Sequence, residues 1–298
     1  MSGLQVVRKM QDGVISPQAR NEAAVALAEL DARATRHYTR CGQGSMVWRN
    51  WGRGAPLLLL HGGGGAWSHW VRNIPALAQH HSVWAPDLPG LGDSDLPAEL
   101  SMESLSDTLA QGLSELVPGD APINLVGFSF GTSVACCLAT RLGGRIRHLV
   151  LAGTRFVFDE ALVYPQLVNW KDCKDSVERL AAHRRNLQIM MIADPDRVDA
   201  LAAHIQATNV PKAKFFGLKL DPTGKVEQYL PQVRPSGSLT GVCGRADQFS
   251  QSLMHRQEAG LKALHPAARF HGIDGAGHWV QYEAAQEFNT VLLQALSA

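Results

Sequence analysis

The chain has 298 residues, of which 45% are hydrophobic and 18% are charged, and its formal net charge is +1. A balance this close to zero gives no electrostatic case for a nucleic-acid partner or for an anionic membrane surface. No apolar run reaches membrane-spanning length, and residues 1–13 lack the apolar core of a secretion signal. We therefore expect a soluble, cytoplasmic protein with no nucleic-acid and no membrane partner.

The cysteines favour the same compartment. There are five, an odd number, and no two are spaced as C-x-x-C. Cys136 and Cys137 lie in an apolar helical pattern and Cys243 lies in an apolar strand pattern, so we interpret them as small buried hydrophobic residues. Unpaired thiols of this kind fit a reducing cytosol.

Residues 1–34 are predicted to form an N-terminal helical extension. Ser16 and Pro17 have the pattern of an N-cap followed by proline at the first helical position. Apolar residues then recur at helical spacing, at Ala23, Leu27, Leu30 and Ala34. This amphipathic helix either packs outside the core or serves as a dimerisation arm, so a homo-oligomer stays open.

The next segments have the pattern of strands. Residues 35–51 alternate as an antiparallel hairpin does, and Pro56–Leu60 is continuously apolar, which is typical of a strand buried on both faces. Four glycines follow at positions 62–65. Without side chains, their backbone N–H groups can turn into a cleft, as an oxyanion hole requires. We predict that the N–H of Gly63 is one oxyanion donor.

A turn-rich loop at residues 87–94 follows the next predicted strand, residues 82–86. Asp87 and Asp93 in this loop are acidic residues at a strand end and could be taken for catalytic acids. Carboxylates in such loops usually accept hydrogen bonds from backbone N–H groups. We therefore predict a structural role for both, and a helix over residues 101–117 after them.

The stretch Ile123–Leu138 predicts a buried strand, a tight turn and a helix. Its centre, Gly127-Phe128-Ser129-Phe130-Gly131, has the G-x-S-x-G spacing of a nucleophile elbow. The two glycines give the clearance that the tight turn needs, and the turn aims the serine hydroxyl at a helix N-terminus. Ser129 is therefore the candidate nucleophile, and the N–H of Phe130 is the candidate second oxyanion donor.

The alternation of strand and helix stops after a strand at residues 148–152. Residues 155–235 predict helical segments instead, with Asp194-Pro195 at the start of one of them. A long helical insertion at the catalytic edge of a sheet is typical of a lid. Five apolar residues of the insertion are candidates for lining a pocket beneath it, or for ordinary packing within it: Trp170, Met190, Met191, Phe215 and Phe216.

Two further strands, residues 238–243 and 268–271, and a helix over 283–295 complete the predicted domain. Strands that alternate with helices predict an α/β fold with a mainly parallel sheet. The predicted core consists of residues 35–154 and 236–298.

A serine hydroxyl becomes a good nucleophile only beside a base that an anion orients. In chain order the candidates are Ser129, Asp247 and His278, and each follows a predicted strand. Asp274 and Asp159 are the competing acids, the first because it is close to His278 in sequence and the second because it follows a strand. We predict Asp247, which follows the preceding strand at the end where the serine lies.

From residue 45 onward the chain resembles the α/β-hydrolase superfamily. Several motifs are similar to the carbon–carbon bond hydrolases of aromatic meta-cleavage pathways: Trp67-Ser68, Arg72-Asn73, Gly244–Asp247, Gly277–Glu283 and Glu287–Asn289. The resemblance implies an α/β-hydrolase fold with a mostly parallel eight-stranded sheet, flanking helices and a helical lid. It also implies the triad and oxyanion donors given above, with Trp279 as a pocket wall.

Two positions depart from the pattern of those carbon–carbon bond hydrolases. They usually carry asparagine before the nucleophile, where this chain has Phe128, and a lid arginine that holds the substrate carboxylate. At the corresponding part of the insertion this chain has His204, with Arg184 and Arg185 well upstream. Phe128 and His204 are therefore predicted pocket residues that weaken the carbon–carbon assignment.

The sequence as a whole predicts a serine hydrolase of a small acyl or diketone substrate, with no cofactor and no metal. Carbon–carbon bond hydrolysis in aromatic degradation is one interpretation, and a carboxylesterase, thioesterase or lactonase is the alternative. A non-catalytic small-molecule receptor or a hydroxynitrile lyase also shares this fold. The intact triad argues against the receptor, and a serine in place of an aspartate nucleophile argues against a dehalogenase or an epoxide hydrolase.

Overall fold

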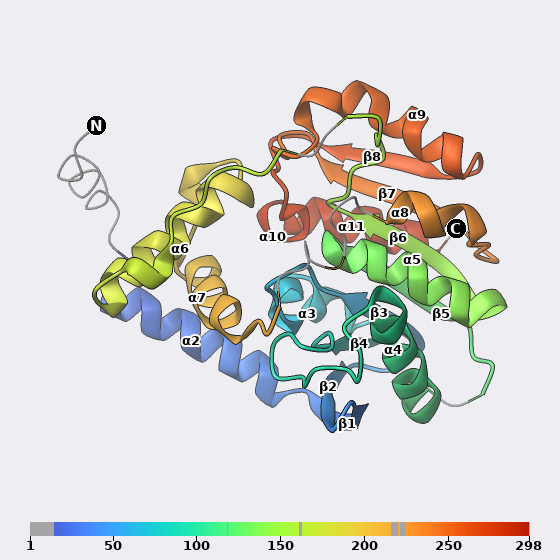
Figure 1. Ribbon diagram of the computed structural model, residues 1–298, viewed down its shortest axis with the longest axis horizontal. Helices are drawn as coiled ribbons and strands as arrows, with labels where there is room; N and C mark the ends of the chain where they lie inside the picture. The colour runs from blue at the N-terminus through green and yellow to red at the C-terminus, as the bar shows by residue number, and fades with distance from the viewer. Residues whose placement is uncertain (1–14, 118, 161–162, 216–219, 221–224, 298) are drawn as a thin grey trace.

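The computed structural model describes residues 15–117, 119–160, 163–215, 220 and 225–297. Its centre is a sheet of eight strands in the order β1-β2-β4-β3-β5-β6-β7-β8 (Figure 1). β2 pairs antiparallel with β1 and β4, and the other neighbours are parallel. The strands are β1 (Thr35–Cys41), β2 (Gly44–Trp51), β3 (Ala55–Leu60), β4 (His81–Pro86), β5 (Ile123–Phe128), β6 (Ile146–Ala152), β7 (Leu239–Gly244) and β8 (Arg269–Ile273).

This architecture confirms the predicted α/β-hydrolase fold. Polar and apolar residues do not alternate in the central strand β3, because side chains on both of its faces are buried. Leu58 and Leu60 belong to the apolar cluster on one face of the sheet, and Leu57 and Leu59 belong to the cluster on the other face. A run of four leucines thus supplies both halves of the core.

The helices cover both faces of the sheet. Leucines of α4 and α9 and small residues of α5 join the first apolar cluster, and residues of α3 and α11 join the second. The helices are α2 (Pro17–Ala32), α3 (Ile74–Leu77), α4 (Met102–Leu116), α5 (Phe130–Leu142), α6 (Ser176–Met190), α7 (Ala200–Asn209), α8 (Val226–Tyr229), α9 (Met254–Leu264), α10 (Val280–Glu283) and α11 (Ala285–Leu296). Within the described residues no helix is long and apolar enough to span a membrane.

The predicted C-terminal helix is confirmed, whereas two other details of local structure differ from the prediction. The helix predicted over 283–295 is α11, which begins after the non-helical backbone of Ala284, while Glu283 ends the short helix α10. Asp194 caps only the three-residue 3-10 helix Pro195–Arg197, and α7 begins later, behind the cap of Asp199. Helix α9 was not predicted, since its sequence MHRQEAGLKAL gives few apolar positions from which to recognise a buried face.

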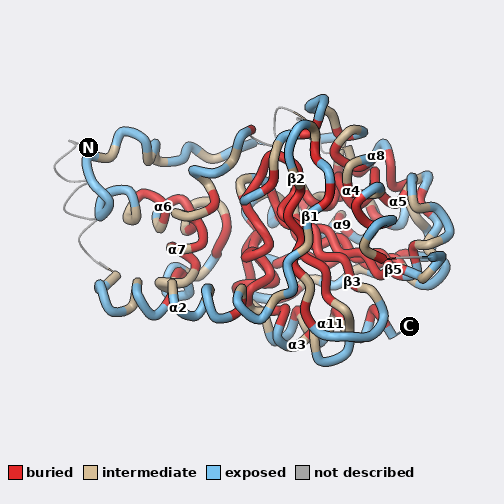
Figure 2. The backbone as a smooth tube through the Cα atoms, turned by 90° about the horizontal axis from the view of Figure 1, so that it is seen from below, coloured by how far each residue is buried: buried red, intermediate tan, exposed pale blue. Residues whose placement is uncertain are grey.

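The insertion between β6 and β7, residues 155–235, contributes α6 and α7, which pack against each other beside the carboxyl ends of the strands (Figure 1). Helix α2 lies along α7 on the side away from α6, and the outer faces of α2 and α6 are exposed (Figure 2). The predicted cap holds, because the Ser16 side chain accepts the N–H of Ala19. The predicted N-terminal helix therefore packs along the insertion, and its C-terminal end contacts β2.

A buried ion cluster fixes the end of α2 to the core. The guanidinium of Arg49 on β2 is 2% exposed and donates to Asp31 of α2 and to Asp87 and Asp93 of the loop after β4. Burial opposes its charge, but the attraction of Asp87 and the bonds to the other two carboxylates raise the pKa of Arg49. Asp87 also accepts the backbone N–H groups of Trp67 and Asp93, in agreement with a structural role.

Candidate active site

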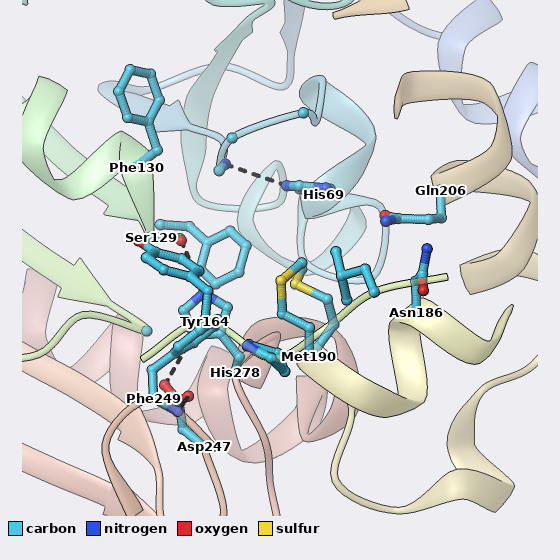
Figure 3. Close-up of a pocket in the computed structure, with 18 of the residues that line it drawn as sticks. His69, Ser129, Phe130, Tyr164, Asn186, Met190, Gln206, Asp247, Phe249 and His278 are labelled. Carbon is cyan, nitrogen blue, oxygen red and sulfur yellow. Dashed lines mark hydrogen bonds and ion pairs between the residues drawn. The ribbon is translucent and has the colours of Figure 1, made fainter. Parts of the chain in front are cut away.

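Three side chains from distant parts of the sequence form a hydrogen-bonded chain at the carboxyl edge of the sheet (Figure 3). The hydroxyl Oγ of Ser129, after β5, lies 2.9 Å from Nε2 of His278. Nδ1 of His278, in the loop between β8 and α10, lies 2.9 Å from Oδ2 of Asp247, after β7. His278 is 7% exposed and Asp247 is 1% exposed. The structure therefore brings together the three residues predicted as a triad.

The turn that carries Ser129 is sterically tight. Ser129 has φ +52° and ψ −120°, and it is the one non-glycine residue with positive φ in the described part of the chain. A Cβ on Gly127 would lie 2.4 Å from the carbonyl oxygen of Gly131, and one on Gly131 would lie 2.5 Å from the carbonyl oxygen of Leu60. Glycine is thus required at both positions for the packing that holds the serine above the sheet.

The carboxylate of Asp247 is held by the loop that carries it. Oδ1 of Asp247 accepts the backbone N–H of Phe249 at 2.9 Å, which leaves Oδ2 for His278. The competing acids have other partners: the Asp274 side chain is 91% exposed and pairs with Arg245, and the Asp159 side chain is 64% exposed and pairs with Arg256. Only Asp247, of the three candidates, lies within hydrogen-bonding distance of His278.

The glycine loop after β3 lies directly against the elbow. A Cβ on Gly62 would stand 3.3 Å from Cβ of Ser129, and one on Gly63 would stand 3.6 Å from Cβ of Phe130. Phe130 is the first residue of α5, where a backbone N–H has no acceptor one turn back in the helix. The predicted donors Gly63 and Phe130 are therefore neighbours, and both line the same cavity as Ser129.

The cavity in front of Ser129 has a volume of about 590 Å³, enough for a small organic substrate. It is bounded by the elbow, the glycine loop and the insertion. Of the predicted pocket residues, Phe128 and Met190 line it, as do Met191 and Trp170. Among the described residues no three His, Cys, Asp or Glu side chains are grouped so that they could hold a metal ion.

Two predicted pocket residues lie elsewhere, and both assignments are corrected. Trp279 is fully buried behind the cavity, stacked on Tyr282, with its indole N–H donated to the backbone oxygen of His69. His204 faces a separate cavity of about 210 Å³ between α2, α7 and the core. Trp279 is held by its contacts with α10 and with the segment that carries His69, and His204 lies on the side of α7 that faces α2.

Three other residues of the insertion that the sequence analysis named, Phe215, Arg184 and Arg185, do not line the cavity. Phe215 is buried against the ring of Phe130, with ring centroids 6.1 Å apart, and it does not line the cavity. Phe216 lies outside the described residues. Arg184 donates to the backbone oxygen of Val198 and Arg185 to the side chain of Gln188, so neither faces the cavity.

Several polar residues that line the cavity were not predicted: His69, His183, Asn186 and Gln206. His183, Asn186 and Met190 follow one another at helical spacing on α6, so the spacing was a signal that could have placed them on one face. The Asn186 amide is bonded within the protein, because it both donates to and accepts from the backbone of Val168. It ties the start of the insertion to α6.

Burial disfavours the charged form of His69 and His183, two of the buried histidines that line the cavity. Burial, followed by the nearby imidazoles of His61 and His278, holds the pKa of His69 well below its ordinary value. Burial alone lowers the pKa of His183 to about 4. Both imidazoles therefore act as hydrogen-bonding groups rather than as cations near neutral pH.

A mostly parallel eight-stranded sheet with a serine on the tight turn after β5 defines the class of α/β-fold hydrolases. The model of the alpha/beta hydrolase family matches residues 57–291, and the chain belongs to that family.

The chain is similar to hydrolases of known activity. It is 30% identical over 267 residues to the 2-hydroxy-6-oxo-6-phenylhexa-2,4-dienoate hydrolase of Burkholderia cepacia, which covers 83% of this chain and 89% of that protein. It is 29% identical over 259 residues to the 2-hydroxymuconate semialdehyde hydrolase of Pseudomonas sp. strain CF600, covering 81% and 86%. The solved meta-cleavage product hydrolase from Pseudomonas fluorescens IP01 has the same fold, with a TM-score of 0.67 at 23% identity over 85% of this chain and 94% of that one.

These matches confirm the resemblance to carbon–carbon bond hydrolases and make the chain a hydrolase of the α/β-hydrolase type.

Proposed function

We propose that this chain is a serine hydrolase in which Ser129, His278 and Asp247 act as a catalytic triad. The observation that carries the proposal is the unbroken chain of two 2.9 Å contacts from Ser129 Oγ through the His278 ring to Asp247. In this arrangement His278 takes a proton from Ser129 or from a water, and Asp247 holds the imidazole in the tautomer whose Nε2 is free to accept it.

In the proposed reaction the substrate carbonyl carbon is attacked and becomes tetrahedral. Its oxygen gains negative charge beside the N–H groups of Gly63 and Phe130, which stabilise the charge at little reorganisation cost because the backbone already holds them in place. His278 then returns the proton to the leaving group. Water repeats the sequence if an acyl–Ser129 intermediate has formed.

We propose that the insertion, residues 155–235, is a lid over this site. Met190 and Met191 at the end of α6 and Val210 after α7 line the cavity that also contains Ser129. A lid of this kind supplies an apolar wall and keeps bulk water from the reacting carbonyl.

For the substrate, the first candidate is a vinylogous diketone whose carbon–carbon bond is hydrolysed. It is supported by the names of the relatives, a 2-hydroxy-6-oxo-6-phenylhexa-2,4-dienoate hydrolase and a 2-hydroxymuconate semialdehyde hydrolase. The second candidate is a carboxylic ester. It is favoured by Phe128, a fully buried aromatic ring that lines the cavity directly before the nucleophile and offers no hydrogen bond to additional substrate oxygens.

Two variants test the nucleophile. Wild type, Ser129→Ala and Ser133→Ala are compared for turnover of p-nitrophenyl esters and of a dienol acid from ring cleavage. Ser133 is a matched control, because its hydroxyl lines the same cavity one turn further along α5. We expect Ser129→Ala to lose at least about 1,000-fold in kcat while Ser133→Ala stays within about tenfold of wild type. Equal turnover by wild type and Ser129→Ala would refute the proposal, and the preferred substrate decides between the two candidates.

A further inference from the structure

His69 presents an unused hydrogen-bond donor to the cavity. Its Nδ1 accepts the backbone N–H of Gly62 at 3.3 Å, so the ring proton lies on Nε2. Nε2 has no hydrogen-bond partner among the described residues, although His69 is only 2% exposed and lines the cavity. The ring, bonded at one edge to the glycine loop, points its other edge toward the side on which Gln206 lies (Figure 3). The donor is therefore available to a molecule inside the cavity.

Gln206 on α7 is a second such group. Its side chain is buried and lines the cavity, and its amide makes no hydrogen bond to any described residue. Figure 3 places this amide on the far side of Met190 from Ser129. A buried amide that lacks a protein partner costs free energy unless a ligand or water satisfies it. The Gln206 amide and the His69 ring together make up a polar part of the cavity wall away from Ser129.

The charge of the cavity wall limits what this position can bind. Arg155 and Asp247 are the charged side chains that line the cavity in the described part of the chain, apart from its histidines. Arg155 follows β6 at the start of the insertion and donates to the backbone oxygen of Glu160, and Asp247 follows β7 and is bonded to His278. Both come from a different part of the cavity wall than His69 and Gln206, which are not charged groups. Burying a carboxylate without a cation partner is costly, whereas a neutral carbonyl or hydroxyl needs only hydrogen bonds.

We propose that His69 and Gln206 form a neutral subsite that binds an uncharged oxygen of the substrate, such as a ketone or hydroxyl, at the end of the chain remote from the scissile carbonyl. The proposal rests on the proposed function in that it names the substrate class of the same site. Met190 and Val210 are apolar residues of the same cavity wall, so the substrate that fits is an apolar chain with one polar, uncharged terminus.

Three p-nitrophenyl esters of equal chain length test the subsite: the hexanoate, the 5-oxohexanoate and the adipate monoester. We expect wild type to have the highest kcat/KM for the 5-oxohexanoate and the lowest for the carboxylate-ended ester. In Gln206→Leu and His69→Leu the preference for 5-oxohexanoate over hexanoate should fall about fivefold, the loss of one hydrogen bond. Gln286→Leu, the same exchange at an exposed position of α11, should leave the preference unchanged.

Binding of the same esters to Ser129→Ala, measured by calorimetry, separates the subsite from catalysis. Tighter binding of the 5-oxohexanoate that Gln206→Leu abolishes supports the subsite, even if wild type hydrolyses none of the esters and the proposed function fails. Equal affinity for the hexanoate and the 5-oxohexanoate, or a preference for the carboxylate, overturns the subsite even if all three esters are hydrolysed. Gln206→Leu keeps the test decisive if His69→Leu does not fold.

Discussion

Replacing Asp247 by asparagine tests the geometry of the candidate triad without removing its shape. Oδ1 of Asp247 accepts the backbone N–H of Phe249, and Oδ2 faces Nδ1 of His278. An asparagine keeps its oxygen on Phe249, because only an acceptor satisfies that N–H, and so turns its NH₂ group toward the imidazole. Nδ1 of His278 must then accept, and the ring proton moves to Nε2.

This tautomer cannot take a proton from Ser129, because Nε2 of His278 already carries one. We expect kcat to fall by about 10,000-fold, a rise of about 5.4 kcal/mol in the activation free energy. Asp247 is 1% exposed and asparagine has nearly the same volume, so the fold should survive. The assay is steady-state hydrolysis of a p-nitrophenyl ester, with thermal unfolding followed in parallel.

Asp274→Asn is the matched control, because Asp274 was the competing acid and its side chain is 91% exposed. We expect it to keep wild-type turnover. The reasoning fails if Asp247→Asn stays within about tenfold of wild type while remaining folded, or if Asp274→Asn loses as much activity as Asp247→Asn. Either result would mean that another group orients His278.

Three further predictions concern stability. Gly131→Ala places a Cβ 2.5 Å from a backbone oxygen and should destabilise the fold by about 1–3 kcal/mol in urea unfolding, whereas Gly144→Ala, with no atom within 4 Å, should change it by less than about 0.5 kcal/mol. Arg49→Met leaves a buried carboxylate unpaired and should cost about 3–5 kcal/mol, while Arg256→Met at an exposed pair should leave the melting temperature unchanged; similar losses would contradict the role of burial. Because burial holds the pKa of His183 at about 4, its stabilising contribution is present above pH 6.5 and is lost as pH falls toward 4. Wild type should therefore lose more stability than His183→Leu between pH 7 and 4, and parallel pH profiles of the two proteins in urea unfolding would refute this.

The meeting of Ser129, His278 and Asp247 was predictable because most of its signals are local. A glycine on each side of Ser129 is demanded by contacts of 2.4 and 2.5 Å, and four glycines after β3 mark the backbone that lies against the elbow. Asp247 and His278 were selected as residues that follow parallel strands, and parallel strands bring their carboxyl ends to one edge. Local sequence plus this one topological rule was enough to assemble the three side chains.

The pocket was much less predictable, because helix orientation decides which residues face it. His204 was expected in the pocket, yet it faces the small cavity beside α2, while Gln206 two positions later faces the main cavity. Trp279 follows His278 directly and is nevertheless buried behind His69. His69 lies in the short 3-10 helix Trp67–Trp70, and all four of its residues are buried. Because this segment has no exposed face, its sequence could not indicate which side chain faces the cavity.

The sequence by itself determined the succession of strands along the chain, the tight turn that carries Ser129 and the identity of the candidate acid and base. These features depend on steric demands and periodicities within a few residues of one another. The tertiary structure alone decided that α2 packs on α7, that Arg49 joins three acidic residues, and that His69 and Gln206 face the cavity. Such contacts depend on how one helix is rotated against another, and that rotation is set by the packing of side chains far apart in the chain.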